Sequence, residues 1–152
     1  KELASVAQLA FLALPHKTSM SFAKELLALD VKVVDLSADY RLKLETYEEY
    51  YCPHEDKENL KFAAYGLAEF YEDQIKNTKL VANPGCYPTA TLLGLLPFVP
   101  YMKKDTNIFI DAKSGLSGAG KKLNETTTFV NISENTFAYN PFKHRHAPEI
   151  KE

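Results

Sequence analysis

Cys86 is the side chain best placed to do chemistry, and it lies in the segment Asn83–Thr89, which reads NPGCYPT. This segment separates a short apolar run over 79–82 from a helical pattern over 89–96. The Pro-Gly pair predicts a sharp strand-to-helix turn, with the thiol at the helix N-terminus. Unsatisfied backbone N–H groups and the helix dipole favour the nucleophilic thiolate there. The alternative is that Cys86 is a small buried hydrophobe.

Two histidines and two arginines complement this thiol. His144 and His146 flank Arg145 late in the chain, and in an extended segment the two imidazoles would share one face. An imidazole that titrates near neutrality can accept the thiol proton and later return it. Arg145 and Arg41 are candidates for binding a carboxylate or phosphate, because a guanidinium forms bidentate pairs with both. Ordinary ion pairs are the alternative for either arginine.

Other sites can be assembled from the same residue types. Cys86, His144 and His146 are all suitable zinc ligands, but the spacing offers no fourth ligand. The segment 115–121 reads GLSGAGK and has the spacing of a phosphate-binding P-loop, although Lys122 stands where a hydroxyl is needed for Mg²⁺. A nucleotide triphosphatase is therefore disfavoured. The glycines still suit close approach of a phosphate or nicotinamide, with a flexible surface hairpin as the alternative.

Hydrophobic periodicity predicts an α/β fold that positions these groups. A buried strand over 9–14, a helix over 21–29 and a strand over 31–36 form a βαβ unit of a parallel sheet. The helix is expected to bury Phe22, Leu26 and Leu29. The other expected elements are short surface helices or irregular structure over 40–58, a helix over 68–75, a strand over 79–82, a helix over 89–96, strands over 107–111 and 128–132, and a helix start at 148–149.

Each of the three parallel strands is followed by polar or turn-forming residues. These clusters occupy 15–19, 37–39 and 83–86. Ligands in open α/β sheets bind beyond the carboxyl ends of the strands, so the three clusters are expected to surround one crevice.

Composition narrows the classes of function. The chain has 152 residues, enough for one domain or for one domain and part of another. A net charge of −2 with scattered charges predicts no nucleic-acid partner and no membrane partner. Two cysteines in unlike settings make no disulfide framework, and Cys52 is expected to have no chemical role. No targeting signal is evident, which predicts a cytoplasmic protein that acts on small molecules.

The segment 81–91 resembles the nucleophile segment of the N-acetyl-gamma-glutamyl-phosphate reductases, which belong to the semialdehyde-dehydrogenase group. Four further segments agree in the same order: FLALPH over 11–16, VDLSADYRL over 34–42, DAKSGLSGAG over 111–120 and HRHAPEI over 144–150. The resemblance implies the later part of a Rossmann-type NAD(P)-binding domain over 1–82. The opening part of an α+β catalytic and dimerisation domain would follow over 83–152. The Gly-rich dinucleotide fingerprint is missing, so the chain is expected to be an excerpt.

The resemblance also implies an activity: NADPH-dependent reduction of N-acetyl-L-glutamyl 5-phosphate to N-acetyl-L-glutamate 5-semialdehyde in arginine biosynthesis, with phosphate release. Cys86 would be the nucleophile and His144 the base. The residues implied at the substrate are Arg41, Arg145 and His146, and those implied beside NADP are Pro15, His16, Ser114, Gly115, Ser117 and Gly118.

Three alternatives stay open: an enzyme like aspartate semialdehyde dehydrogenase, a cysteine hydrolase, and a non-catalytic folded fragment or assembly module. The complete enzyme is expected to be a homo-oligomer. The 152 residues alone are expected to bind NADPH weakly and to turn over negligibly.

Overall fold

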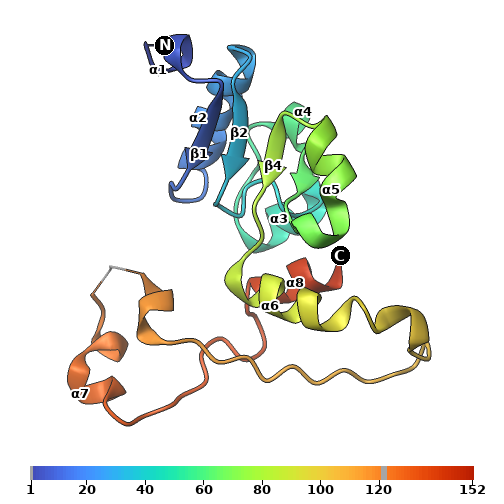
Figure 1. The fold of residues 1–152 in the computed structure, drawn as a ribbon. Helices are drawn as coiled ribbons and strands as arrows, with labels where there is room; N and C mark the ends of the chain where they lie inside the picture. Colours follow the sequence, from blue (N-terminus) through green and yellow to red (C-terminus); the bar gives the residue numbers. More distant parts are fainter. Residues whose placement is uncertain (1, 121–122) are drawn as a thin grey trace. The chain divides into compact units, whose positions relative to one another are not determined.

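The structure is a computed structural model that describes residues 2–120 and 123–152. The chain divides into two compact units (Figure 1). The first unit comprises Lys1–Pro100 and Arg145–Glu152, and the second comprises Tyr101–His144. The C-terminal helix thus belongs to the unit that contains the sheet.

The first unit is built on a parallel sheet of four strands in the order β1-β2-β4-β3 (Figure 1). The strands are β1 (Leu9–Leu12), β2 (Lys32–Asp35), β3 (Ala64–Tyr65) and β4 (Leu80–Ala82). The α/β class and the three expected parallel strands are confirmed. The two-residue strand β3 was not predicted, because two residues carry no periodicity.

Helices surround this sheet and extend from it. The first unit contains α1 (Glu2–Val6), α2 (Thr18–Ala28), α3 (Leu44–Tyr50), α4 (Lys57–Leu60), α5 (Ala68–Asn77), α6 (Cys86–Leu95) and α8 (His146–Lys151). Helix α6 packs against α8 (Figure 1). The 3₁₀ turn η1 (Val99–Tyr101) follows α6, and the second unit holds η2 (Leu116–Ala119), η3 (Glu125–Thr127) and α7 (Phe129–Ile132). Among the described helices, none combines the length and the apolar composition that a bilayer crossing requires.

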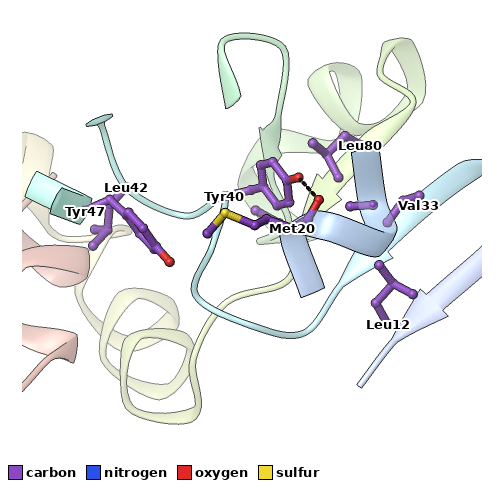
Figure 2. Packing of buried hydrophobic residues seen from close by; sticks show 9 residues of the cluster. Leu12, Met20, Val33, Tyr40, Leu42, Tyr47 and Leu80 are labelled. Carbon is purple, nitrogen blue, oxygen red and sulfur yellow. Dashed lines mark hydrogen bonds between the residues drawn. The ribbon is translucent and has the colours of Figure 1, made fainter. Parts of the chain in front are cut away.

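The hydrophobic core lies between the sheet, α2 and α3. Its buried members are Leu12, Met20, Ala23, Val33, Tyr40, Leu42, Tyr47, Leu80 and Ala82 (Figure 2). The Tyr40 hydroxyl donates a hydrogen bond to the carbonyl of Met20 at 3.2 Å, which joins the loop after β2 to α2 (Figure 2). Tyr47 is completely buried, so the expectation that the whole of 40–58 lies on the surface was wrong.

Two details of burial differ from the prediction. Helix α2 buries Ser19, Met20 and Ala23, whereas Phe22 is 51% exposed. The small residues Ser19 and Ala23 are buried together with Met20, whereas Phe22 lies on the outer side of the helix. Strand β1 was expected to be buried, but Phe11 is 69% exposed because β1 lies at one edge of the sheet.

The two strands predicted late in the chain were wrong. In the part that the structure describes, 107–111 pairs with no strand, and Ile108 and Ile110 are half-exposed. Alternating hydrophobicity predicts a strand only where another strand supplies hydrogen-bond partners. The segment 128–132 contains α7 instead, because Asn131 and Ile132 donate backbone hydrogen bonds to the carbonyl of Thr128.

Replacing Leu80, which is buried in the core, tests this assignment. The change Leu80→Ala is expected to lower the free energy of unfolding by about 2 to 5 kcal/mol, because it removes buried methyl groups and leaves a cavity. Leu123→Ala, at a side chain that is 88% exposed, is the control and should change it by less than about 0.5 kcal/mol. Urea unfolding followed by circular dichroism measures both, and equal losses would contradict the core assignment.

Candidate active site

The three polar clusters meet at the carboxyl edge of the sheet. Strands β1, β2 and β4 are neighbours, and hydrogen bonds join residues at or just after their carboxyl ends. The Ala38 N–H donates to Nδ1 of His16 at 3.0 Å, and the Asn83 N–H donates to the carbonyl of Asp35 at 2.8 Å. The predicted convergence of these clusters is therefore confirmed.

Asp39 organises one side of this edge. Its completely buried carboxylate accepts hydrogen bonds from the N–H groups of Lys17 and Met20, at 2.9 and 3.0 Å, and from the Tyr47 hydroxyl at 2.7 Å. Burial raises the pKa of Tyr47 well above its usual range, and the bond to Asp39 raises it further. The N-terminus of α2 thus already receives a carboxylate, so it is not open to a phosphate.

His16 lies beside Asp39 as a neutral ring. Its Nδ1 accepts a hydrogen bond from Ala38, which requires that nitrogen to be unprotonated. Desolvation lowers the pKa of His16, and the positive charges of Arg41 and Arg145 lower it further against the opposing effect of Asp39. The imidazole at this edge therefore favours its uncharged form.

Cys86 is the first residue of α6, and its side chain is exposed. The preceding Gly85 is the N-cap, with φ −67° and ψ 159°. Its carbonyl accepts from both the N–H and the hydroxyl of Thr89, each at 2.9 Å. The predicted thiol at a helix N-terminus is confirmed. Within the described residues, no group of three or more His, Cys, Asp or Glu side chains is placed to hold a metal ion.

Glu149 holds the residue that precedes Cys86. Its side chain is only 2% exposed, and one carboxylate oxygen accepts hydrogen bonds from the Gly85 N–H at 2.8 Å and the Tyr65 hydroxyl at 2.9 Å. The other oxygen lies 3.4 Å from Nη1 of Arg41. A carboxylate from α8 therefore anchors the start of α6. Sequence reasoning assigned no role to Glu149 or Tyr65, although Glu149 belongs to the HRHAPEI segment.

Arg41 is almost as deeply buried, with 7% of its side chain exposed. Its Nε donates to the carbonyl of Asn83 at 2.7 Å, and its Nη2 donates to the carbonyl of Leu36 at 2.8 Å. Each of the three guanidinium nitrogens thus contacts an acceptor of the chain itself. The expectation that Arg41 contacts the substrate stays a prediction.

The late histidines fall in different units. Helix α8 begins at His146, and Arg145 before it has helical backbone angles, so the expectation of an extended segment was wrong. A Cβ at Gly85 would lie 2.6 Å from Nε2 of His146, which places this imidazole against the turn before Cys86. His144 belongs to the second unit, where its Nε2 lies 3.1 Å from the Tyr139 hydroxyl, and desolvation lowers its pKa. The assignment of His144 as the base stays a prediction.

Tyr51 joins two of the predicted site residues, and sequence reasoning missed it. The guanidinium of Arg145 lies over its ring, 5.2 Å from the centroid. The ring of His16 meets it edge to face at 5.0 Å, and Tyr47 stacks on it at 5.1 Å. The exposed guanidinium of Arg145 is thus held on an aromatic face beside His16.

In the second unit, 114–118 forms a tight turn. The Gly118 N–H donates to the carbonyl of Gly115 at 3.0 Å, and Ser117 lies in η2. A Cβ at Gly118 would lie 2.2 Å from Oγ of Ser114, so a side chain there would require the Ser114 hydroxyl to move. The prediction on Lys121 and Lys122 lies outside the described residues.

Comparison with protein families divides the chain into two matched parts. Residues 1–78 match the family described as "Semialdehyde dehydrogenase, NAD binding domain". Residues 86–152 match the one described as "Semialdehyde dehydrogenase, dimerisation domain". The two matches together leave only the segment 79–85 uncovered, which holds β4 and the turn before Cys86.

Several curated proteins that are similar to the chain carry the name N-acetyl-gamma-glutamyl-phosphate reductase. The protein of Sulfurovum sp. (strain NBC37-1) is 63% identical over 150 residues, which cover 99% of this chain and 45% of the relative. That of Wolinella succinogenes is 62% identical over 152 residues, 100% of this chain and 45% of the relative. That of Aquifex aeolicus is 47% identical over 147 residues, 95% of this chain and 43% of the relative. The chain thus spans less than half the length of these relatives.

The crowding around Gly85 can be tested with a matched pair of glycines. Gly85→Ala would press a methyl group against His146 and Arg41, so it is expected to lower the free energy of unfolding by about 1 to 3 kcal/mol. Gly94→Ala, in the same helix and with open space around it, should instead raise it by about 0.5 to 1 kcal/mol. Urea unfolding measures both, and a neutral Gly85→Ala would contradict the close packing at this turn.

Proposed function

The chain belongs to the semialdehyde dehydrogenase family, and we propose that it is part of an enzyme that reduces N-acetyl-L-glutamyl 5-phosphate to N-acetyl-L-glutamate 5-semialdehyde, a step of arginine biosynthesis. The observation that carries this proposal is the exposed thiol of Cys86 at the first position of α6. The names of the similar curated proteins support the choice of substrate.

The chemistry proposed for Cys86 has two stages. Its thiolate attacks the acyl carbon of the substrate, and the bond between that carbon and the phosphate oxygen breaks. Inorganic phosphate is released, and the acyl group remains bound to Cys86 as a thioester. The reduced nicotinamide cofactor, when bound, supplies the hydride that this thioester needs. The carbon–sulfur bond then breaks, which releases the aldehyde and regenerates the thiolate. Sulfur suits both stages because a thiolate is a strong nucleophile and a competent leaving group.

The chain's other groups assist these stages. Backbone N–H groups near Cys86 would stabilise the negative charge that develops on the carbonyl oxygen of the substrate. We assign proton transfer to His144. Arg145 and His146 would contact the substrate, since the guanidinium of Arg145 is exposed and His146 packs against the turn before Cys86. Arg41 is the third substrate residue of the proposal, and it also holds the strand ends together.

The residues at the carboxyl edge fit a nicotinamide dinucleotide, and we propose NADP. Pro15 and His16 follow β1 at the edge where such sheets bind nucleotides, and His16 is held by its bond to Ala38. The turn over 114–118 carries no side chain at Gly115 or Gly118, which suits close approach of the cofactor. Ser114, Gly115, Ser117 and Gly118 would line it. Asp39 fills the N-terminus of α2, so the pyrophosphate would bind elsewhere.

The proposal also covers the domains and the assembly of the complete enzyme. Residues 1–82 would belong to the nucleotide-binding domain and 83–152 to the catalytic and dimerisation domain. The complete enzyme would be a cytoplasmic homo-oligomer that uses a small-molecule substrate and phosphate.

A cysteine pair tests the nucleophile in the complete enzyme. Cys86→Ser should lower turnover of N-acetyl-glutamate semialdehyde, phosphate and NADP⁺ by roughly 10³-fold or more, because the hydroxyl forms no thioester. Cys52→Ser is the control and should keep most of the activity, since a hydroxyl retains the contact that the Cys52 sulfur makes with the Tyr47 hydroxyl at 3.6 Å.

Formation of NADPH at 340 nm measures the rate, and mass spectrometry detects the acyl-enzyme. A Cys86→Ser enzyme that keeps near wild-type turnover and still traps substrate covalently would refute the assignment. Preferred turnover of aspartate semialdehyde would move the proposal to that substrate.

A further inference from the structure

We propose that Glu149 is a positioning residue whose buried charge, balanced by Arg41, sets how readily Cys86 forms its thiolate. The inference rests on the proposed role of Cys86 as the nucleophile and deepens it. Glu149 lies on α8 and Arg41 follows β2, so two distant parts of the chain deliver opposite charges to the residue that precedes the thiol.

The buried carboxylate of Glu149 is held by three partners. The carboxylate accepts from the Gly85 N–H at 2.8 Å and from the Tyr65 hydroxyl at 2.9 Å, and it pairs with Arg41 at 3.4 Å. Residue 149 is 64 positions from Gly85 in the sequence, so the contact is set by the fold and not by neighbouring residues. The peptide group between Pro84 and Gly85 is thereby fixed relative to both charges.

Burial makes the balance of these charges matter. The side chains of Glu149 and Arg41 are 2% and 7% exposed, so water and salt screen them weakly. Together they contribute no net charge beside the turn. Loss of either partner would leave one unbalanced charge at the turn that precedes Cys86, and a positive charge favours a nearby thiolate whereas a negative charge disfavours it.

Titratable groups close to this turn or to the ion pair include Tyr65 from β3, Tyr87 from α6 and His146 from α8, and also Tyr51 after α3 with Arg145 over its ring. Burial raises the pKa of Tyr65, and the negative charge of Glu149 raises it further, so Tyr65 acts as a neutral donor. The Tyr65 hydroxyl therefore contributes a hydrogen bond without altering the charge. This difference provides the matched control.

The experiment compares variants of the complete enzyme by the rate at which iodoacetamide alkylates Cys86 between pH 5 and 10, with the modified peptide quantified by mass spectrometry. Glu149→Gln keeps an oxygen for the Gly85 N–H but leaves Arg41 unbalanced, so the pH midpoint of alkylation should fall by about one unit from the wild-type value. Tyr65→Phe removes one hydrogen bond and no charge, so its midpoint should equal that of the wild type.

Arg41→Gln removes the positive partner of the ion pair. It tests the proposal even if the Glu149→Gln protein does not fold. Its midpoint should rise, because Glu149 is left unbalanced, and the double variant Arg41→Gln/Glu149→Gln should return toward the wild type. A Glu149→Gln profile that superimposes on the wild type would overturn the proposal. So would a Tyr65→Phe shift of equal size, because it would assign the effect to a lost hydrogen bond.

The outcome is separable from that of the proposed reaction. Turnover of the wild-type enzyme is measured in parallel with NADP⁺, phosphate and N-acetyl-glutamate semialdehyde. Normal turnover with an unshifted midpoint in Glu149→Gln rejects the role of Glu149 alone. Absent turnover together with the expected shifts of the alkylation midpoint rejects the proposed reaction. The proposed effect of Glu149 and Arg41 on Cys86 would still hold.

Discussion

The buried ion pair between Arg41 and Glu149 fixes the turn on which Cys86 stands. Removing two charges from water is costly, and their mutual attraction offsets that cost only when further hydrogen bonds satisfy both groups. Here those bonds come from the carbonyls of Leu36 and Asn83, the N–H of Gly85 and the hydroxyl of Tyr65. The pair therefore forms only when β2, β3, β4 and α8 are all in place, and it makes the position of the thiol a consequence of the whole first unit.

A second carboxylate acts in the same way on the other side of the sheet edge. Asp39 accepts from the N–H groups of Lys17 and Met20 and so completes the N-terminus of α2 from outside that helix. Glu149 instead reaches the N-cap residue of α6, one position before the thiol. One helix terminus at this edge is thus closed by an internal anion, whereas the other begins with an exposed cysteine. The two helix starts at this edge of the sheet therefore differ in the group that they present: a buried carboxylate at α2 and an exposed thiol at α6.

Local patterns predicted the elements that depend on local forces. Strands β2 and β4 and the start of α6 followed from short apolar runs and from the Pro-Gly pair before Cys86. The segment 107–111 failed as a strand because pairing depends on a partner elsewhere in the chain. The buried face of α2 was misread because Ser19 and Ala23 allow close packing, which a search for large apolar residues overlooks. Glu149 and Tyr65 carry no local signal at all, since their contacts join residues 64 and 84 positions apart.

Space, and not backbone conformation, constrains residue 85. The φ of −67° and ψ of 159° at Gly85 are angles that any residue adopts. What excludes a side chain is space, because a Cβ would lie 2.6 Å from His146 and 3.0 Å from Arg41. The same absence of a Cβ lets the imidazole and the guanidinium approach the peptide before Cys86. Glycine at this position is therefore a condition for packing His146 and Arg41 against the turn before Cys86, and the sharp turn itself follows from Pro84 and the start of the helix.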